Sequence, residues 1–207
     1  MFKTSISSLC SLGLCALMAT AGVNAAPATG VKTQLPVTVA TCGLHLAARF
    51  VESAPKDRFQ IDNLSSGRWS ITSITFELET AQGKLIFDTD DGGGGREVFQ
   101  PFEEVRFASD LRYAKLRRLS QLTDGGSVLN LDFQNFEPDE RFAFTIDVDD
   151  QLAGGSQLGE IRVTGGELQG ATLRFVLASL TGQIVSASTQ FDKNNQAILK
   201  GRDCNQG

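Results

Sequence analysis

Hydrophobic and polar residues alternate most clearly over residues 142–150, Phe-Ala-Phe-Thr-Ile-Asp-Val-Asp-Asp. The apolar residues fall on every second position, at Phe142, Phe144, Ile146 and Val148. This period of two is typical of a β-strand with one buried face. We therefore expect a core strand whose end carries the carboxylates of Asp147, Asp149 and Asp150.

An earlier stretch has the same design. Residues 85–88 read Leu-Ile-Phe-Asp and are followed by Thr89, Asp90, Asp91 and four glycines at 92–95. Asp88 and Asp90 fall on one face of an extended chain, as do Asp147 and Asp149, because alternate residues point to the same side. If the two strand ends lie side by side, six carboxylates meet at one edge of the molecule.

The rest of the chain predicts one antiparallel β-sandwich of about ten to twelve short strands with at most one short helix. The expected strands lie near residues 44–52, 59–61, 69–78, 84–88, 97–107, 128–133, 142–150, 160–163, 171–177, 184–191 and 197–200. The alternation slips at Thr72–Ser73, which indicates a β-bulge. Trp69, in the same strand, is expected in the core.

Residues 110–121 are ambiguous. Asp110 is a suitable cap for a short helix, with Leu111, Ala114 and Leu119 roughly on one face. The segment holds the main basic cluster of an acidic chain, which comprises Arg112, Lys115, Arg117 and Arg118. Two interpretations stay open: a solvated face, or a patch for an anionic polymer such as an acidic polysaccharide.

The N-terminus resembles a secretory signal. Lys3 precedes an apolar stretch, and small residues before Ala25 predict cleavage there. A lipid anchor is not expected, since leucines precede Cys10 and Cys15 where a lipoprotein signal needs a small residue. We expect residues 1–25 to be removed, 26–41 to form a linker and entry strand, and 42–207 to form the sandwich. No later apolar run is long enough to span a bilayer, so the mature protein is expected in the periplasm or the medium.

Two cysteines remain after this cleavage, Cys42 and Cys204. An oxidising compartment favours a disulfide between them, which would stabilise the fold by roughly 4–5 kcal/mol in the chain-entropy account. Two free thiols are the alternative.

Charge and motifs restrict the function. The formal net charge of −5 at pH 7 disfavours a nucleic-acid partner, because such proteins are normally basic. His45 is the only histidine, and no Gly-x-Ser-x-Gly motif or histidine-rich metal set occurs, so the sequence predicts no catalytic residues. A secreted glycan hydrolase with paired carboxylates and a purely structural domain without an ion remain as alternatives.

The aspartates point to calcium, which takes six to eight oxygen ligands in flexible geometry. The expected ligands are Asp88, Asp90, Asp91, Asp147, Asp149 and Asp150, and the glycine loops would supply carbonyl groups. The spacing is not that of an EF-hand. The same aspartates could instead keep strand ends soluble and block edge pairing.

Four stretches also carry a resemblance to a known family. They are Ala-Pro-Lys-Asp-Arg-Phe at 54–59, residues 85–103, Phe-Thr-Ile-Asp-Val-Asp-Asp at 144–150, and Gly-Gly-Glu-Leu-Gln-Gly-Ala at 165–171. Together they resemble secreted bacterial "aggregation factor core" proteins, named for similarity to a segment of the marine-sponge aggregation factor, a proteoglycan core. The resemblance implies a non-catalytic adhesion or binding module with a link to calcium. The sequence shows no internal repeat and does not predict an oligomeric state.

Overall fold

The computed structural model of the chain describes residues 41–51, 56–95, 99–106, 111–150 and 165–204. These residues belong to one structural unit, residues 36–207, whereas the unit of residues 1–35 lies outside them. The expected signal peptide, most of the linker, and the strand expected at 160–163 therefore lie outside the described residues.

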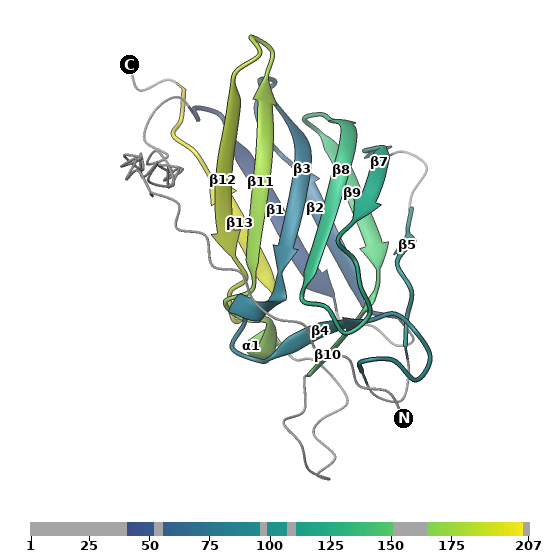
Figure 1. The fold of residues 1–207 in the computed structure, drawn as a ribbon. Helices are drawn as coiled ribbons and strands as arrows, with labels where there is room; N and C mark the ends of the chain where they lie inside the picture. Colours follow the sequence, from purple (N-terminus) through teal and green to yellow (C-terminus); the bar gives the residue numbers. More distant parts are fainter. Residues whose placement is uncertain (1–40, 52–55, 96–98, 107–110, 151–164, 205–207) are drawn as a thin grey trace, which may run out of the picture. The chain divides into compact units, whose positions relative to one another are not determined.

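The first of two large sheets has the strand order β13-β1-β2-β9-β5, with β6 also pairing with β9 (Figure 1). Its strands are β1 (His45–Val51), β2 (Arg58–Asn63), β5 (Glu103–Glu104), β6 (Arg112–Tyr113), β9 (Glu140–Thr145) and β13 (Gln196–Lys200). Every pair is antiparallel except β6 with β9, which is parallel.

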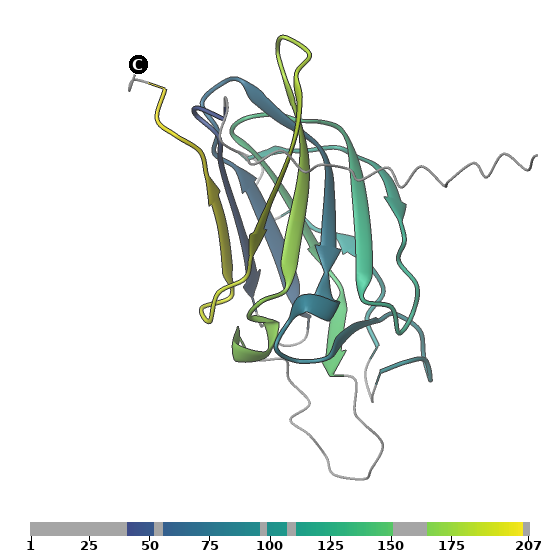
Figure 2. The same cartoon turned by 60° about the vertical axis from the view of Figure 1, so that its left-hand side comes forward.

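The second sheet is antiparallel throughout and has the order β12-β11-β3-β8-β7. Its strands are β3 (Trp69–Glu77), β7 (Leu116–Ser120), β8 (Val128–Phe136), β11 (Thr172–Ser179) and β12 (Ile184–Gln190). The register of β3 against β8 shifts between Ile71 and Ser73, which confirms the bulge predicted from the slipped alternation. Figure 2 shows the two sheets as facing layers.

Phenylalanine rings fill the space between the layers. Phe59 of β2 meets Phe76 of β3 with ring centroids 5.2 Å apart, and Phe76 lies 5.5 Å from Phe144 of β9. Phe133 of β8 and Phe142 of β9 are 4.9 Å apart. Each such pair adds about 0.5–1.5 kcal/mol beyond its buried area. These contacts between the two layers confirm the predicted all-β sandwich.

The stretch at 142–150 forms two strands rather than one. Its alternate apolar residues are buried as predicted, but the chain leaves the first sheet after Thr145. Ile146 connects β9 to β10 (Asp147–Asp150), which pairs with β4 (Leu85–Asp88) in a separate two-stranded sheet. Figure 1 shows this β4–β10 pair across one end of the sandwich.

The helix considered for residues 110–121 does not form. The described part of this segment contains β6 and β7 instead, because pairing with β9 and β8 outweighs a weak local helix preference. The described helices are α1 (Gly165–Leu168) and the 3-10 turn η1 (Leu78–Thr80). No described helix is long and apolar enough to cross a membrane.

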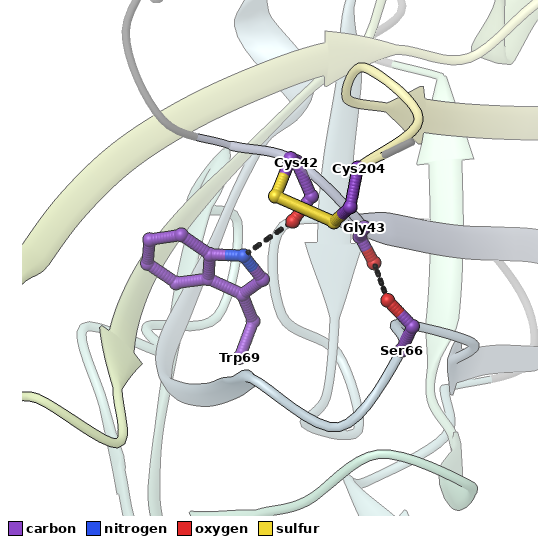
Figure 3. Close-up of a disulfide and its surroundings, with 5 residues drawn as sticks. All are labelled: Cys42, Gly43, Ser66, Trp69 and Cys204. Atoms are coloured by element: carbon purple, nitrogen blue, oxygen red, sulfur yellow. Dashed lines mark hydrogen bonds between the residues drawn. A yellow bond between two sulfur atoms is a disulfide. The ribbon is translucent and has the colours of Figure 1, made fainter. Parts of the chain in front are cut away.

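Cys42 and Cys204 form a disulfide with their Cα atoms 4.7 Å apart (Figure 3). This bond ties the segment after β13 to the start of β1. Trp69 is 3% exposed and lies beside it, and its Nε1 donates a hydrogen bond to the carbonyl of Cys42 at 3.2 Å. The structure thus agrees with the predicted cysteine pairing and with Trp69 as a core residue.

Candidate metal centre

The β4–β10 pair brings the two aspartate-rich strand ends together. Asp147 lies directly opposite Asp88 in the antiparallel register, and Asp149 lies opposite Ile86. Opposed residues share a face of the sheet, and so do residues two apart on one strand. The register therefore places Asp88, Asp147 and Asp149 on one face.

These three aspartates, here called the acidic triad, are close enough to share one ion. One carboxylate oxygen from each lies within 4.8 Å of the other two. Calcium–oxygen distances of about 2.3–2.6 Å allow ligands on opposite sides of one ion to be roughly 4.6–5.2 Å apart. The carboxylate oxygens of the triad are thus close enough to one another to contact a single calcium ion.

Asp88 is the most confined member of the triad. It is 3% exposed, and its Oδ1 atom has no hydrogen-bond partner among the described residues. A buried carboxylate oxygen without a partner is costly unless the carboxyl group is protonated or meets a cation. The backbone N–H of Gly95 bonds to the Asp88 carboxylate, but burial and repulsion outweigh that bond in their effect on its pKa. A proton or an ion would therefore stabilise Asp88.

The pKa values of Asp88 and Asp147 show that their surroundings disfavour the charged carboxylates. Burial, followed by repulsion from Asp149 and Asp124, raises the pKa of Asp88 to about 6. Burial, followed by repulsion from Asp149, Asp57 and Asp88, raises the pKa of Asp147 to about 7. Near neutral pH the triad consequently holds more negative charge than its surroundings stabilise.

The glycine loop after β4 closes over the carboxylates. A Cβ atom built on Gly95 would collide with the Oδ2 atoms of Asp88 and Asp149. Because only a residue without a side chain fits there, the backbone of Gly95 lies directly beside the carboxylates. The space over the triad suits an ion or a water molecule better than a larger ligand.

Asp124 fixes this loop, and sequence reasoning missed it. Its carboxylate accepts hydrogen bonds from the backbone N–H groups of Thr89 at 2.7 Å, Asp90 at 3.1 Å and Gly94 at 2.7 Å. These bonds, led by that from Thr89, lower the pKa of Asp124. The Asp-Gly-Gly sequence at 124–126 indicated only a turn, and nothing local showed that the turn reaches a loop 30 residues earlier.

Gln100 bridges the two strands of the pair and was also missed. Its backbone N–H donates to the carbonyl of Asp88 at 3.1 Å, and its carbonyl accepts from the N–H of Asp147 at 3.2 Å. The side chain is 7% exposed, and its Nε2 has no partner among the described residues, like Oγ1 of the buried Thr145. Buried polar atoms without a partner among the described residues thus occur in Asp88 itself and in Gln100, whose backbone bonds to Asp88 and Asp147, which is typical of a site completed by water or an ion.

The other predicted acidic ligands lie apart from the triad. Asp90 and Asp91 are exposed and do not belong to the described group of carboxylates that could hold an ion. Asp150 belongs to β10, but its side chain lies outside the described residues. The structure thus brings together three of the six predicted ligands.

The basic cluster lies on β6, on β7 and between them. Two of its four cations form ion pairs. Arg112 forms ion pairs with Glu137 at 3.0 Å and Glu140 at 3.3 Å. Arg118 pairs with Asp132 at 2.6 Å. Within the part of the chain that the structure describes, Lys115 and Arg117 form no ion pair, and both are exposed.

Comparison with family models, curated proteins and solved structures gives no match for this chain.

Proposed function

We propose that this chain is a secreted, non-catalytic binding module whose β4–β10 end is stabilised by one calcium ion. The observation that carries the proposal is the buried, unpartnered Oδ1 atom of Asp88 beside two further carboxylates. A divalent cation would replace the mutual repulsion of Asp88, Asp147 and Asp149 by attraction. It would also join β4 to β10 across the end of the sandwich.

The donor atoms favour calcium over other metals. The triad supplies only carboxylate oxygens, which suit hard cations such as calcium and magnesium rather than zinc or copper. Calcium accepts the irregular geometry of three strand residues more readily than magnesium, which requires a near-ideal octahedron. Backbone carbonyls and water would complete the sphere.

Two carboxyl groups with raised pKa values also suggest a glycan hydrolase, since catalytic pairs often have such values. The position of Gly95 argues against that use. Its backbone leaves no room for a methyl group beside Asp88 and Asp149, so a sugar ring could not reach these two carboxylates from the side of the glycine loop. Ion binding is therefore the better proposal.

The proposed extracellular role has separate support. The N-terminal signal pattern and the Cys42–Cys204 disulfide favour an oxidising compartment. The resemblance to aggregation factor core proteins favours adhesion or binding at a cell surface or matrix. Secretion can be tested directly by determining the N-terminus of the exported chain, which we expect to begin at Ala26.

Thermal unfolding tests the ion site. In EDTA and in millimolar calcium, the wild type is compared with two variants that remove equal charge. Asp147→Asn/Asp149→Asn removes two triad carboxylates, whereas Asp90→Asn/Asp91→Asn removes two exposed loop carboxylates. Calcium at about 100 times Kd should stabilise the wild type by roughly 2.7 kcal/mol, or about 5–10 °C in Tm.

The loop variant should respond to calcium like the wild type, and the triad variant should not respond. A response lost only in the loop variant would move the ion to the glycine loop. Identical curves for the wild type in EDTA and in calcium would contradict an ion site altogether.

A further inference from the structure

Strand β7 forms an edge of the second sheet and pairs only with β8 among the described strands. Its register against β8 shifts, so that Leu116 lies opposite Phe133 and Arg118 lies opposite Asp132, with no opposing residue for Arg117. Such a bulge bends the strand and redirects its side chains. Arg117 thus lies at the edge of the sheet without an opposed residue on β8.

The bulge borders an open hollow of about 490 Å³, lined by Lys115, Leu116, Arg117 and Gln134. Lys115 and Arg117 are the two basic-cluster residues without an ion pair in the described chain, and none of the described residues that line the hollow carries a carboxylate. The carbonyl of Lys115 accepts a hydrogen bond from the N–H of Gln134 at 3.1 Å, which holds the two sides of the hollow together. The hollow therefore combines two available cations with one amide and one aliphatic side chain.

We propose that this hollow binds the acidic sugars of a polysaccharide, with Lys115 and Arg117 on the carboxylate or sulfate group. Arg117 can bond such a group through two N–H donors, and Lys115 adds a point charge. The half-buried Leu116 would pack against the C–H face of a sugar ring, and the Gln134 amide would bond to hydroxyl groups. This inference rests on the binding role proposed above but does not require the calcium site.

A nucleic acid would offer the same anionic chemistry but fits the hollow less well. Single strands are bound by stacking bases on aromatic side chains, and none of the described lining residues is aromatic. The whole chain is acidic, at −5, which opposes the long-range attraction on which nucleic-acid binding depends. A short, local contact with spaced acidic sugars is less sensitive to that net charge.

The test measures binding of the purified protein to polygalacturonate, dextran sulfate, neutral dextran and single-stranded poly(dT), each in EDTA and in calcium. Lys115→Glu/Arg117→Glu should weaken binding to the preferred acidic polysaccharide at least about tenfold, the equivalent of 1.4 kcal/mol. The matched control Lys193→Glu/Arg202→Glu makes the same charge change at two exposed positions and should alter affinity by less than about twofold, as expected for distant rim charges. Gln134→Ala changes no charge and should weaken binding by about two- to fivefold, because it removes one hydrogen-bonding group.

Carboxylate and sulfate recognition are separated by which of the two acidic polymers binds more tightly. Equal losses in both double variants would overturn the proposal, because they would show that only net charge matters. Binding to neither acidic polysaccharide, or tighter binding to poly(dT), would also overturn it. If the charge-reversed variant fails to unfold cooperatively, Lys115→Gln/Arg117→Gln replaces it with the same expected direction.

The experiments distinguish a failure of the polysaccharide proposal from a failure of the calcium proposal. Hollow binding should persist in EDTA, and the triad variant Asp147→Asn/Asp149→Asn should retain it. Conversely, Lys115→Glu/Arg117→Glu should retain the calcium-dependent rise in Tm.

Discussion

The acidic triad and the basic strand β7 both gather like charges, but the molecule treats them in opposite ways. In the triad, Asp88 and Asp147 face each other across a strand pair, and Asp88 is buried. On β7 the cations are exposed, and Arg118 forms an ion pair with a carboxylate on the neighbouring strand β8. The triad gathers its charges around one buried and two half-buried carboxylates, whereas the cations of β7 lie along a solvent-exposed strand.

The comparison teaches that burial, rather than the number of charges, indicates where a ligand is needed. An exposed arginine loses little when it has no partner, because water solvates it and surface pairs contribute only about 0–1 kcal/mol. A buried carboxylate has no such alternative. A bound ion would therefore stabilise the triad, whereas the exposed cations of the hollow at β7 remain solvated without a ligand at little cost.

The largest expected effect is that of Asp88→Asn. The amide keeps the shape of the side chain but removes the buried charge. In EDTA at pH 7.5 the variant should be more stable than the wild type by about 1–2 kcal/mol, since each pKa unit corresponds to about 1.4 kcal/mol and solvent at the open side of the triad reduces the full value. Calcium should no longer raise its Tm.

Chemical unfolding of the wild type and of Asp88→Asn, in EDTA and in calcium, measures the free energy of unfolding. A variant less stable than the wild type in EDTA would contradict a repulsive triad.

Gly95→Ala should destabilise the protein by about 1 kcal/mol, the lower end of the range for overpacking a confined site, because carboxylate ends of side chains can shift, and it should weaken calcium binding. The methyl group would collide with Asp88 and Asp149. Gly92→Ala provides a control with contrasting surroundings, because a Cβ atom there meets nothing within 4 Å, although its positive φ of 70° adds its own strain. Only the variant at Gly95 should alter the calcium dependence of Tm.

Stability should also depend on pH in a direction opposite to ordinary acid unfolding. The raised pKa values of Asp88, about 6, and Asp147, about 7, mean that the folded state binds protons more tightly than the unfolded chain. Their stabilising contribution is complete below the ordinary carboxyl range and is lost as pH rises through 6 and 7. In EDTA, Tm should therefore fall between pH 5.5 and 8, and saturating calcium should flatten the curve.

The lowered pKa values of Asp124 and Asp192 act in the other direction. Their contribution is present above the ordinary carboxyl range and is lost only as pH falls below it, outside this window. Asp147→Asn/Asp149→Asn should flatten the profile in EDTA. A wild-type Tm that rises from pH 5.5 to 8 in EDTA would contradict the assignment.

The smallest effect on stability should come from the exposed strand β7. Arg118→Gln removes the exposed ion pair with Asp132 and should change the free energy of unfolding by less than about 1 kcal/mol. The change should shrink further in 0.5 M salt, since exposed pairs are screened. A salt-independent loss of several kcal/mol would show that β7 carries buried charge after all.

Much of the fold could be predicted from alternation alone. The apolar period at Phe142, Phe144, Ile146 and Val148 identified buried positions correctly. Alternate residues of a strand point to the same face, so a buried face requires an apolar residue at every second position. The slipped period identified the bulge beside Thr72, and the paired aspartate-rich ends correctly suggested that β4 and β10 meet. Each of these features is local or depends on two similar strand ends.

The rest required tertiary structure. The break at Ile146 that moves the chain from one sheet to another leaves the alternation intact. The carboxylate of Asp124 and the backbone of Gln100 reach the site from distant loops through hydrogen bonds with backbone groups, which no residue pattern encodes. The segment at 110–121 was ambiguous because its pairing with β8 and β9, rather than its own composition, makes it strand.

Equilibrium dialysis against calcium measures directly whether the acidic triad binds an ion. We expect one calcium ion per chain for the wild type and for Asp90→Asn/Asp91→Asn, and none for Asp147→Asn/Asp149→Asn at the same free calcium. Equal calcium binding by the wild type and the triad variant, or no binding by the wild type, would contradict an ion site at the triad.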